Sequence, residues 1–374
     1  MKFSGAVYYG SDFAFHKGGF AVVDGRFADV GADNGGEDLG GAYVIPGLID
    51  IHNHGNSGCD FSDGSLEGVT VMARYLAQNG ITSFAPASMT LGEEQLASAF
   101  ETAAQLHEDT PEDAAMLRGI HMEGPFFSFK KKGAQNPAYL RDPDYEMFLR
   151  LNEKAKGLIK IADVAPELPG ATEYVEKVKD ICTVSIAHTD AGYDEAKTAI
   201  DAGASHLTHL YNAMPGLHHR NPGVIGAAAE NENVTAELIC DGKHVHPSAV
   251  RAAFKLFGAE RICMISDALS ACGMADGEYE LGGQQIFVKD GLAFLGDGVT
   301  IAGSAANLFS GLQKTISFGI RPEDAIRAAT YNPAKVIGAQ DEVGSIENGK
   351  CADFLVLNEK FELQSVYLRG KKLF

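Results

Sequence analysis

Short apolar segments alternate with amphipathic segments through most of this chain, and this alternation restricts the fold more than any other feature. Eight apolar runs follow one another: VIPGLIDIH, ITSFAPA, AMLRGIHMEG, LIKIADVAPE, CTVSIAHT, SHLTHLYN, VTAELICDG and ICMISDA. Helical patterns such as SLEGVTVMARYLAQNG, YDEAKTAIDAG and HPSAVRAAFKLFG separate many of them. Strands that alternate with helices form parallel βα units, and eight units predict an α/β fold with a closed, TIM-like (β/α)8 barrel.

The two ends of the chain show a different pattern. The first 46 residues contain AVYYG, GFAVVDGRFADVG and AYVIPG, which are short strands with tight turns, and VVDGR indicates a hairpin. Residues 340–374 contain VGSIENGKCADFLVLN and FELQSVYLRGKKLF, which have the same character. We therefore expect residues 1–46 and 340–374 to pair into one small β domain beside a barrel of residues 47–339. The length of 374 residues suits this division.

Charge and cysteine content exclude several classes of partner. The chain has 31 basic and 50 acidic residues, a net charge of −19, which disfavours nucleic acid and anionic membranes. No apolar run approaches the length of a membrane span or a signal-peptide core. The six cysteines form no CxxC pair, so free thiols and a reducing cytoplasmic location are expected.

Polar residues recur where the predicted strands end, which is where barrel enzymes place their active sites. The candidates are His52 and His54 after the first run, Glu123 after the third, His188 after the fifth, His209 after the sixth and Asp267 after the eighth. A single histidine at a strand end is more often structural, but five candidate ligands on four strand ends predict a metal site. Imidazole and carboxylate ligands accept zinc, iron, cobalt or manganese. His121 and His206 are better explained as hydrogen-bonded packing residues behind the ligands.

Two further residues, Asp267 and His244, have both a chemical and a structural explanation, and a third, His246, has only a structural one. Asp267 either caps a helix or exchanges a proton with the attacking water and the leaving group, and its strand-end position favours the proton transfer. His244 is either an ordinary loop histidine or a donor to a substrate carbonyl. His246 precedes Pro247 and is expected only to lead into a helix.

A polar loop, residues 212–223, follows His209 and contains two candidate cations. Arg220 and His219 suit a phosphate or carboxylate group, although a loop arginine is more often a solvated surface charge. The run Lys130-Lys131-Lys132 is also more often a solvated face, but its position soon after Glu123 allows it to attract an anion.

Taken together, these motifs resemble the amidohydrolase superfamily and, within it, the N-acetylglucosamine-6-phosphate deacetylases. The matching segments are PGLIDIHNHG, HMEGPF, KKGAQNP, AHTDAGY, THLYNAM, HRNPG, DGKHVHP, SDA, TYNPAKVIG and VGSIENGKCADFLVL. HMEGPF, THLYNAM and HRNPG in combination separate this group from dihydroorotases and D-aminoacylases.

The resemblance implies hydrolysis of the acetamide of N-acetylglucosamine 6-phosphate to glucosamine 6-phosphate and acetate, in amino-sugar catabolism and cell-wall sugar recycling. It implies a distorted barrel with a β-sandwich built from both termini, usually in a homodimer. It implies metal held by Glu123, His188 and His209, with Asp267 as acid/base. The implied substrate contacts are Gly124, Gln135, Asn212, Ala213, His219, Arg220, His244 and Ala306, with His244 on the acetyl carbonyl and Arg220 on the 6-phosphate, helped by His219.

Two positions vary within the group. Some members lack the first two histidines and carry one metal, whereas His52 and His54 here allow a second ion bridged by Glu123. Gln135 stands where other members have a histidine linked to the phosphate, so its role is open. Zinc is the expected metal, with one or two ions per subunit. N-acetylgalactosamine 6-phosphate, another N-acyl compound, and a barrel without catalysis are the alternative functions.

Overall fold

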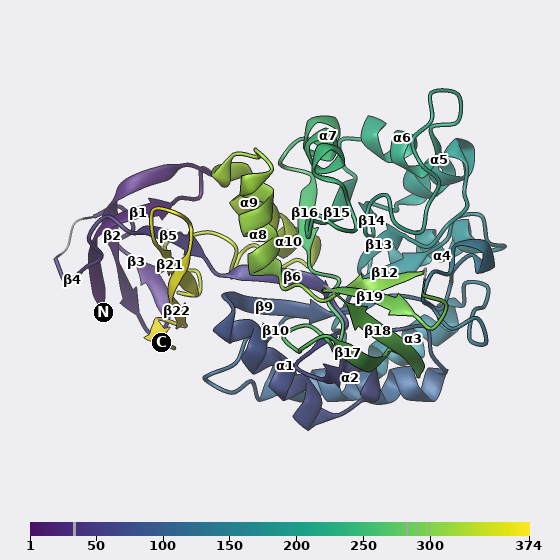
Figure 1. Cartoon of the computed structure of the whole chain (residues 1–374), viewed down its shortest axis with the longest axis horizontal. Helices are drawn as coiled ribbons and strands as arrows, with labels where there is room; N and C mark the ends of the chain where they lie inside the picture. Colours follow the sequence, from purple (N-terminus) through teal and green to yellow (C-terminus); the bar gives the residue numbers. More distant parts are fainter. Residues whose placement is uncertain (33–34, 282, 290, 299) are drawn as a thin grey trace.

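The computed structural model describes residues 1–32, 35–281, 283–289, 291–298 and 300–374. A small sheet domain containing both chain ends lies beside a larger α/β part, and helices α8, α9 and α10 lie between them in the view of Figure 1.

All eight apolar runs form parallel strands of the larger part. These strands are β6 (Leu48–Asn53), β9 (Ile81–Pro86), β10 (Met116–Leu117) with β11 (Ile120–Met122), β12 (Ile159–Val164), β13 (Thr183–Ile186), β14 (His206–Leu207), β15 (Thr235–Ile239) and β16 (Ile262–Ile265). They pair as two sheets, β10-β9-β6 and β11 to β16 in order. Single bridges, Ala87 to His121 and Asn53 to Ala268, join the two sheets. The predicted barrel is therefore confirmed in a distorted form.

Helices follow most of the strands, as the amphipathic segments predict. They are α1 (Leu66–Gln78), α2 (Glu93–Glu108), α3 (Tyr145–Lys154), α4 (Ala171–Val178), α5 (Tyr193–Ala202), α6 (Gly223–Glu230), α7 (Pro247–Phe257), α8 (Leu308–Ser317), α9 (Pro322–Ala329) and α10 (Tyr331–Val336). Ser65 caps α1 by accepting from the Gly68 amide. His246 caps α7, which confirms that it leads into a helix. None of the described helices is both long and apolar enough to cross a membrane.

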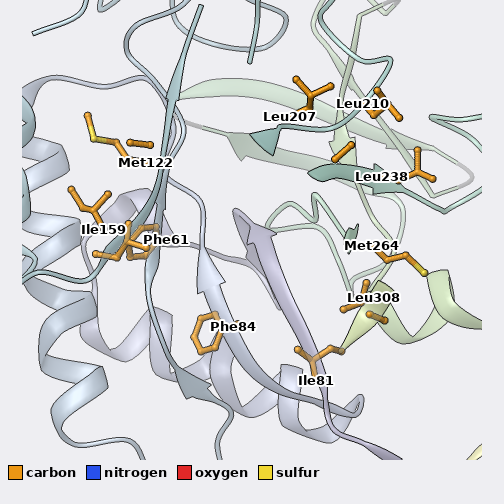
Figure 2. Packing of buried hydrophobic residues seen from close by; sticks show 14 of the residues in the cluster. Phe61, Ile81, Phe84, Met122, Ile159, Leu207, Leu210, Leu238, Met264 and Leu308 are labelled. Atoms are coloured by element: carbon orange, nitrogen blue, oxygen red, sulfur yellow. The ribbon is translucent and has the colours of Figure 1, made fainter. Parts of the chain in front are cut away.

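Buried side chains fill the space between strands and helices. Figure 2 shows Ile81 and Phe84 of β9 and Met264 of β16, with Leu308 of α8 beside Met264. All four are at most 1% exposed. This packing fixes the strands whose ends carry the polar residues.

The chain ends form one eight-stranded sheet of order β23-β22-β21-β5-β1-β2-β3, with β4 beside β1. Its strands are β1 (Lys2–Tyr9), β2 (Phe15–Val23), β3 (Arg26–Ala28), β4 (Glu37–Asp38), β5 (Tyr43–Pro46), β21 (Phe354–Leu357), β22 (Leu363–Leu368) and β23 (Lys371–Lys372). Val44 of β5 pairs with Val356 of β21, so the two ends do share a sheet. Val23 pairs with Arg26, which confirms the predicted hairpin. The domain limits at residues 46 and 339 stay a prediction.

An antiparallel sheet between β16 and α8 was not predicted from the sequence. It contains β17 (Gly277–Leu281), β18 (Gln284–Lys289), β19 (Leu292–Leu295) and β20 (Ile301–Ser304). Buried and exposed residues alternate along β18, unlike the continuously buried strands of the barrel. Short elements complete the rim: β7 (Gly55–Asn56), β8 (Cys59–Asp60), and the 3₁₀ helices η1 (Phe61–Asp63) and η2 (Phe129–Lys131).

Candidate active site

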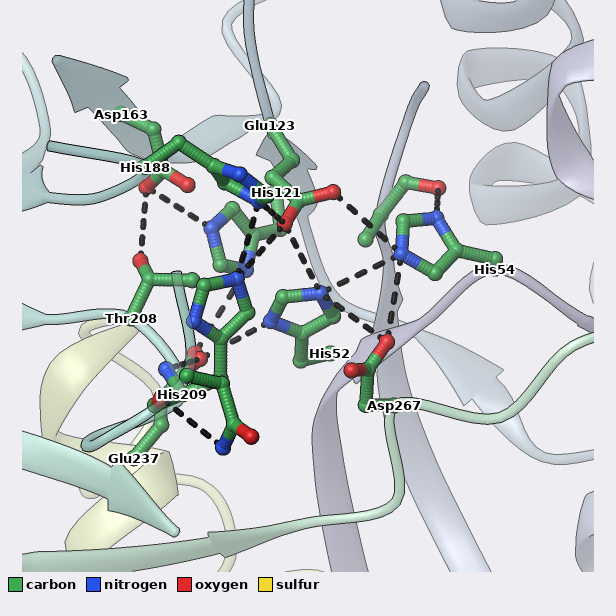
Figure 3. Close-up of polar contacts among 12 residues, drawn as sticks. His52, His54, His121, Glu123, Asp163, His188, Thr208, His209, Glu237 and Asp267 are labelled. Carbon is green, nitrogen blue, oxygen red and sulfur yellow. Dashed lines mark hydrogen bonds and ion pairs between the residues drawn. The ribbon is translucent and has the colours of Figure 1, made fainter. Parts of the chain in front are cut away.

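The residues predicted as metal ligands meet at the carboxyl ends of the barrel strands. His52 is the penultimate residue of β6, and His54 follows that strand. Glu123 follows β11, and His188, His209 and Asp267 each lie two residues beyond their strands. Figure 3 shows these six side chains directed toward one another. The structure therefore brings together every predicted ligand and the predicted acid/base.

Glu123, His188 and His209 form the tighter of two adjacent groups. Oε1 of Glu123 lies 3.1 Å from Nε2 of His188 and 3.2 Å from Nε2 of His209. The two Nε2 atoms are 3.0 Å apart. Ligands about 2.0–2.1 Å from a tetrahedral zinc ion lie roughly 3.3 Å from one another. The spacing of the three atoms therefore suits a metal ion.

His52, His54 and Asp267 form the second group, immediately beside the first. Nε2 of His52 lies 3.6 Å from Oδ1 of Asp267, and Nε2 of His54 lies 3.4 Å from the same oxygen. Oε2 of Glu123 lies 3.3 Å from Nε2 of His54. One carboxylate thus has an oxygen toward each group, which is the arrangement that a bridging ligand requires.

In three of the histidines, Nδ1 faces an oxygen acceptor, which leaves Nε2 with a lone pair that can bind metal. Nδ1 of His188 faces the Lys131 carbonyl at 2.9 Å, and Nδ1 of His54 faces the Ala87 carbonyl at 3.1 Å. Nδ1 of His52 lies 2.9 Å from Oε2 of Glu237. A ring that donates from Nδ1 to a carbonyl or carboxylate leaves a lone pair on Nε2, and metal-bound histidines usually have such an acceptor behind them. The donor set therefore fits a divalent metal.

The surrounding imidazoles keep both inner carboxylates ionised. Burial by itself raises the pKa of Glu123, but His52 and His188 outweigh it and hold this pKa well below its usual range. Burial likewise opposes ionisation of Asp267, and His54 and His52 lower the pKa of that group on balance. Asp267 is therefore a carboxylate at neutral pH, able to accept a proton.

The backbone at the site is strained in a consistent way. His188, His209 and Asp267 have φ angles of 42°, 32° and 47°, and Ala213 has 50°. Residues other than glycine rarely adopt this left-handed backbone conformation. Those that do gather at functional sites, where the surrounding structure enforces the conformation. Here the strain occurs two residues beyond three barrel strands, where it directs the ligand side chains inward.

A layer of buried charges lies beneath the metal-binding groups, and the sequence reading missed most of it. Oε2 of Glu237, on β15, accepts from Nδ1 of His52 and from the His209 amide at 3.1 Å. Nε2 of His121 lies 2.9 Å from Oδ1 of Asp163 on β12. His121 is therefore a buried supporting residue. Glu237 is the glutamate inside the apolar run VTAELICDG. Its position alone could have indicated a role, because an isolated charge in a buried strand needs a partner.

A cavity of about 320 Å³ opens above the metal-binding groups. Among the predicted contacts, Gln135, Asn212, Ala213 and His244 line it, together with His54, Glu123, His188, His209 and Asp267. Residues that the sequence reading did not select also line it: Met89, Gly133, Ala134, Leu269, Leu281, Ile301, Ala302 and Gly303. Four of these belong to the antiparallel sheet β17–β20, so this insertion forms one wall. Lys130 and Lys131 are the basic residues among its lining.

His244 is held with one nitrogen toward the cavity. Its Nδ1 lies 2.7 Å from Oδ2 of Asp241, whose other oxygen accepts from the His244 amide at 2.9 Å. Burial opposes ionisation of Asp241, but His244 outweighs it and lowers the pKa of Asp241 to about 2. Nε2 of His244 is buried and has no hydrogen-bond partner among the described residues, so it is available to a bound molecule.

The remaining predicted contacts lie apart from the cavity wall. His219 and Arg220 are exposed, and Nη1 of Arg220 lies 2.9 Å from Nε2 of His219. Arg220 lines a separate surface depression with Tyr193 and Glu230. The amide of Ala306 donates to Ser304 at 2.9 Å. The phosphate role of Arg220 and His219 and the substrate role of Ala306 stay predictions.

Gly124 is required by the packing behind Glu123. Its φ is 93°, and a Cβ atom there would lie 2.2 Å from Oγ1 of Thr90. Any side chain at this position would displace Thr90 or the backbone that carries Glu123. Its predicted substrate contact stays untested.

Comparison with known proteins gives consistent matches over nearly the whole chain. The pattern of the amidohydrolase family matches residues 43–373. N-acetylglucosamine-6-phosphate deacetylase of Bacillus subtilis is 38% identical over 337 residues, covering 89% of this chain and 85% of the relative. N-acetylgalactosamine-6-phosphate deacetylase of Escherichia coli O157:H7 is 32% identical over 330 residues, covering 88% and 87%.

A solved structure matches the whole architecture. It is a mutant N-acetyl-D-glucosamine-6-phosphate deacetylase of Mycobacterium smegmatis, with an aspartate replaced by alanine, in complex with N-acetyl-D-glucosamine-6-phosphate. The TM-score is 0.93 at 30% identity, and the match covers 100% of this chain and 99% of that chain.

Proposed function

Because this chain belongs to the amidohydrolase family, we infer its reaction from the site that the family fold carries here. The chain hydrolyses the acetamide of N-acetyl-D-glucosamine 6-phosphate to D-glucosamine 6-phosphate and acetate. The observation that carries this conclusion is the ligand set Glu123, His188 and His209 beside ionised Asp267 under one cavity. Relatives with this named activity cover most of the chain at up to 38% identity.

A divalent metal belongs to this site, and we propose that Glu123, His188 and His209 hold it. His52 and His54, with Oε2 of Glu123, form the proposed second position. Zinc is the proposed ion, since two imidazoles and a carboxylate form a ligand set that suits it. When bound, a divalent cation supplies Lewis acidity at the amide carbonyl and increases the acidity of water.

The proposed proton transfers run through Asp267. Its carboxylate accepts a proton from the attacking water and then delivers it to the amide nitrogen as the C–N bond breaks. The aspartate mutant of the M. smegmatis enzyme was solved with N-acetyl-D-glucosamine-6-phosphate bound, which is consistent with loss of turnover when such a group is removed. Nε2 of His244 is proposed to stabilise negative charge on the acetyl oxygen.

The phosphate is proposed to bind at the basic side of the cavity. Lys130 and Lys131 line that cavity, whereas Arg220 does not line the cavity of its own chain. The proposed contact from Arg220 therefore requires movement of its loop or the same loop from a second copy. We propose a homodimer, and mixing Arg220→Ala with Asp267→Asn chains tests a shared site. Activity of the mixture above the sum of the two separate variants supports a shared site, and activity equal to that sum contradicts it.

Acetate release from N-acetylglucosamine 6-phosphate, with metal analysis of the same sample, tests the function directly. Release that is lost on chelation and restored by Zn²⁺ is the expected result. N-acetylgalactosamine 6-phosphate is the second candidate, because one relative carries that name at 32% identity. A higher kcat/KM for the galactosamine compound would reverse the assignment.

The six free cysteines support the further proposal of a reducing, cytoplasmic location.

A further inference from the structure

The loop of residues 128–135 contacts two of the proposed metal ligands from outside the metal-binding groups. The Ser128 amide donates to the His188 carbonyl at 3.0 Å. The Lys131 carbonyl faces Nδ1 of His188 at 2.9 Å. At the other end of the loop, Nε2 of Gln135 donates to Oε2 of Glu123 at 2.7 Å. The loop thus sets the orientation of a histidine and of a carboxylate that share one proposed ion.

The Gln135 side chain is buried, with 3% of its surface exposed, and its amide is fixed from both sides. Its Oε1 accepts from the Thr90 amide at 2.7 Å while its Nε2 donates to Glu123. Turning the amide over would set Oε1 against the carboxylate and the NH₂ group against the Thr90 N–H. Both contacts would then be repulsive, so the network permits one orientation.

The contact controls which way the Glu123 carboxylate faces. With Oε2 held by Gln135, Oε1 lies 3.1 Å and 3.2 Å from Nε2 of His188 and His209. Rotation of the carboxylate would cost the Gln135 hydrogen bond, and a hydrogen bond to a charged acceptor is stronger than one between neutral groups. Nε2 of His54, which belongs to the proposed second metal position, lies 3.3 Å from the same oxygen, so Gln135 acts as the neutral donor that holds Oε2.

We infer that Gln135 is a positioning residue that orients Glu123 for metal binding, in place of the substrate contact that the family resemblance implies. This inference rests on the proposed ligand role of Glu123. We therefore expect Gln135 to affect metal affinity and coordination geometry directly, and substrate affinity only through them.

The test measures Zn²⁺ binding by chelator competition in metal-depleted wild type, Gln135→Leu and Gln135→Met. Both substitutions remove the amide with little change in size. Loss of a residue that orients a ligand lowers metal affinity by about 10–100-fold, and we expect a loss in this range. The visible absorption of the Co²⁺-loaded protein should also change, because it reports ligand geometry. Circular dichroism confirms that each variant is folded.

Asn136→Ala is the matched control, since Asn136 is next to Gln135 and its side chain accepts from the Ala138 amide at 3.0 Å, away from Glu123. It should leave Zn²⁺ affinity and the Co²⁺ spectrum unchanged. Folded Gln135 variants with wild-type affinity and spectrum, but a raised KM for the phosphorylated sugar, would overturn the inference. Glu123→Gln separates this failure from failure of the proposed site. If Glu123→Gln keeps full Zn²⁺ affinity, the ligand set itself is wrong; if it loses affinity and Gln135→Leu does not, only the role of Gln135 fails.

Discussion

Replacing Glu237 with glutamine tests the charge layer beneath the metal-binding groups. Glu237 is fully buried, and its Oε2 accepts from Nδ1 of His52 at 2.9 Å and from the His209 amide at 3.1 Å. Its Oε1 lies 3.5 Å from Nδ1 of His121 and 3.4 Å from Nε2 of His206. Glutamine keeps the volume of the side chain and removes its charge, so the variant isolates electrostatics from packing.

The expected loss of unfolding free energy follows from these contacts. A hydrogen bond to a charged group contributes about 1.5–3 kcal/mol, against about 1 kcal/mol for a neutral pair. Weakening the two bonds to Oε2 therefore costs roughly 1–4 kcal/mol. Removing the only partner of a buried charge costs about 3–5 kcal/mol of unfolding free energy. Asp163 still faces His121 at 2.9 Å, so we expect about 3 kcal/mol at pH 7.

The same substitution should change how stability depends on pH. Burial lowers the pKa of His121, but Asp163 and Glu237 outweigh it and raise this pKa to about 10. An unfolded histidine titrates near about 6.5. The contribution of His121 is therefore fully present below pH ~6.5 and is lost as pH rises toward ~10. Without Glu237 the pKa of His121 falls, so the alkaline loss of stability should end at a lower pH and be smaller in total.

Urea unfolding at pH 7 and pH 9, in metal-free buffer, measures both effects. The chain has no tryptophan, so far-UV circular dichroism is the suitable probe. Glu101→Gln is the control, because Glu101 is exposed and its ion pair is with exposed Lys154 at 2.7 Å. Exposed pairs contribute about 0–1 kcal/mol. If Glu237→Gln lowers the unfolding free energy at pH 7 by less than about 1 kcal/mol, or by no more than the control does, this charge has no stabilising role.

Three predictions concern turnover. Asp267→Asn should lower kcat by about 10²–10⁴-fold with metal content unchanged, and near-normal acetate release would contradict its role. Arg220→Ala should mainly raise KM for the phosphorylated sugar, which kinetics against the unphosphorylated sugar check; an unchanged preference would argue against a phosphate contact. Asp241→Asn removes the charged partner of His244 and should lower kcat about 10–100-fold, from the ~1.5–3 kcal/mol of that hydrogen bond. Wild-type turnover of this variant would show that His244 needs no such support.

The fold was predictable because its evidence is local. Each barrel strand is a continuous apolar run followed by an amphipathic helix, and this pattern alone indicates parallel strands buried on both faces. The insertion β17–β20 escaped prediction because its alternating residues belong to a different kind of sheet. Its contribution of Leu281 and Ile301 to the cavity wall depends on how that sheet folds over the barrel.

The candidate site residues were also predictable, since His52, His54, Glu123 and Asp267 are polar groups at the ends of apolar strands. Strand ends meet at one edge of a barrel, so residue type and position sufficed. The positions of Arg220 and Gln135 were not predictable, because both belong to loops whose course is set by packing and hydrogen bonding.

The sequence by itself determined which chemical groups reach the mouth of the barrel, because a period of one strand and one helix places each strand end there. Only the tertiary structure decided which of those groups face one another. Oε1 of Glu123 turns toward His188 and His209, Oε2 turns toward His54 and Gln135, and Glu237 supports His52 from below. These contacts join residues far apart in the chain, and their distances follow from side-chain packing across the barrel, which no local pattern encodes.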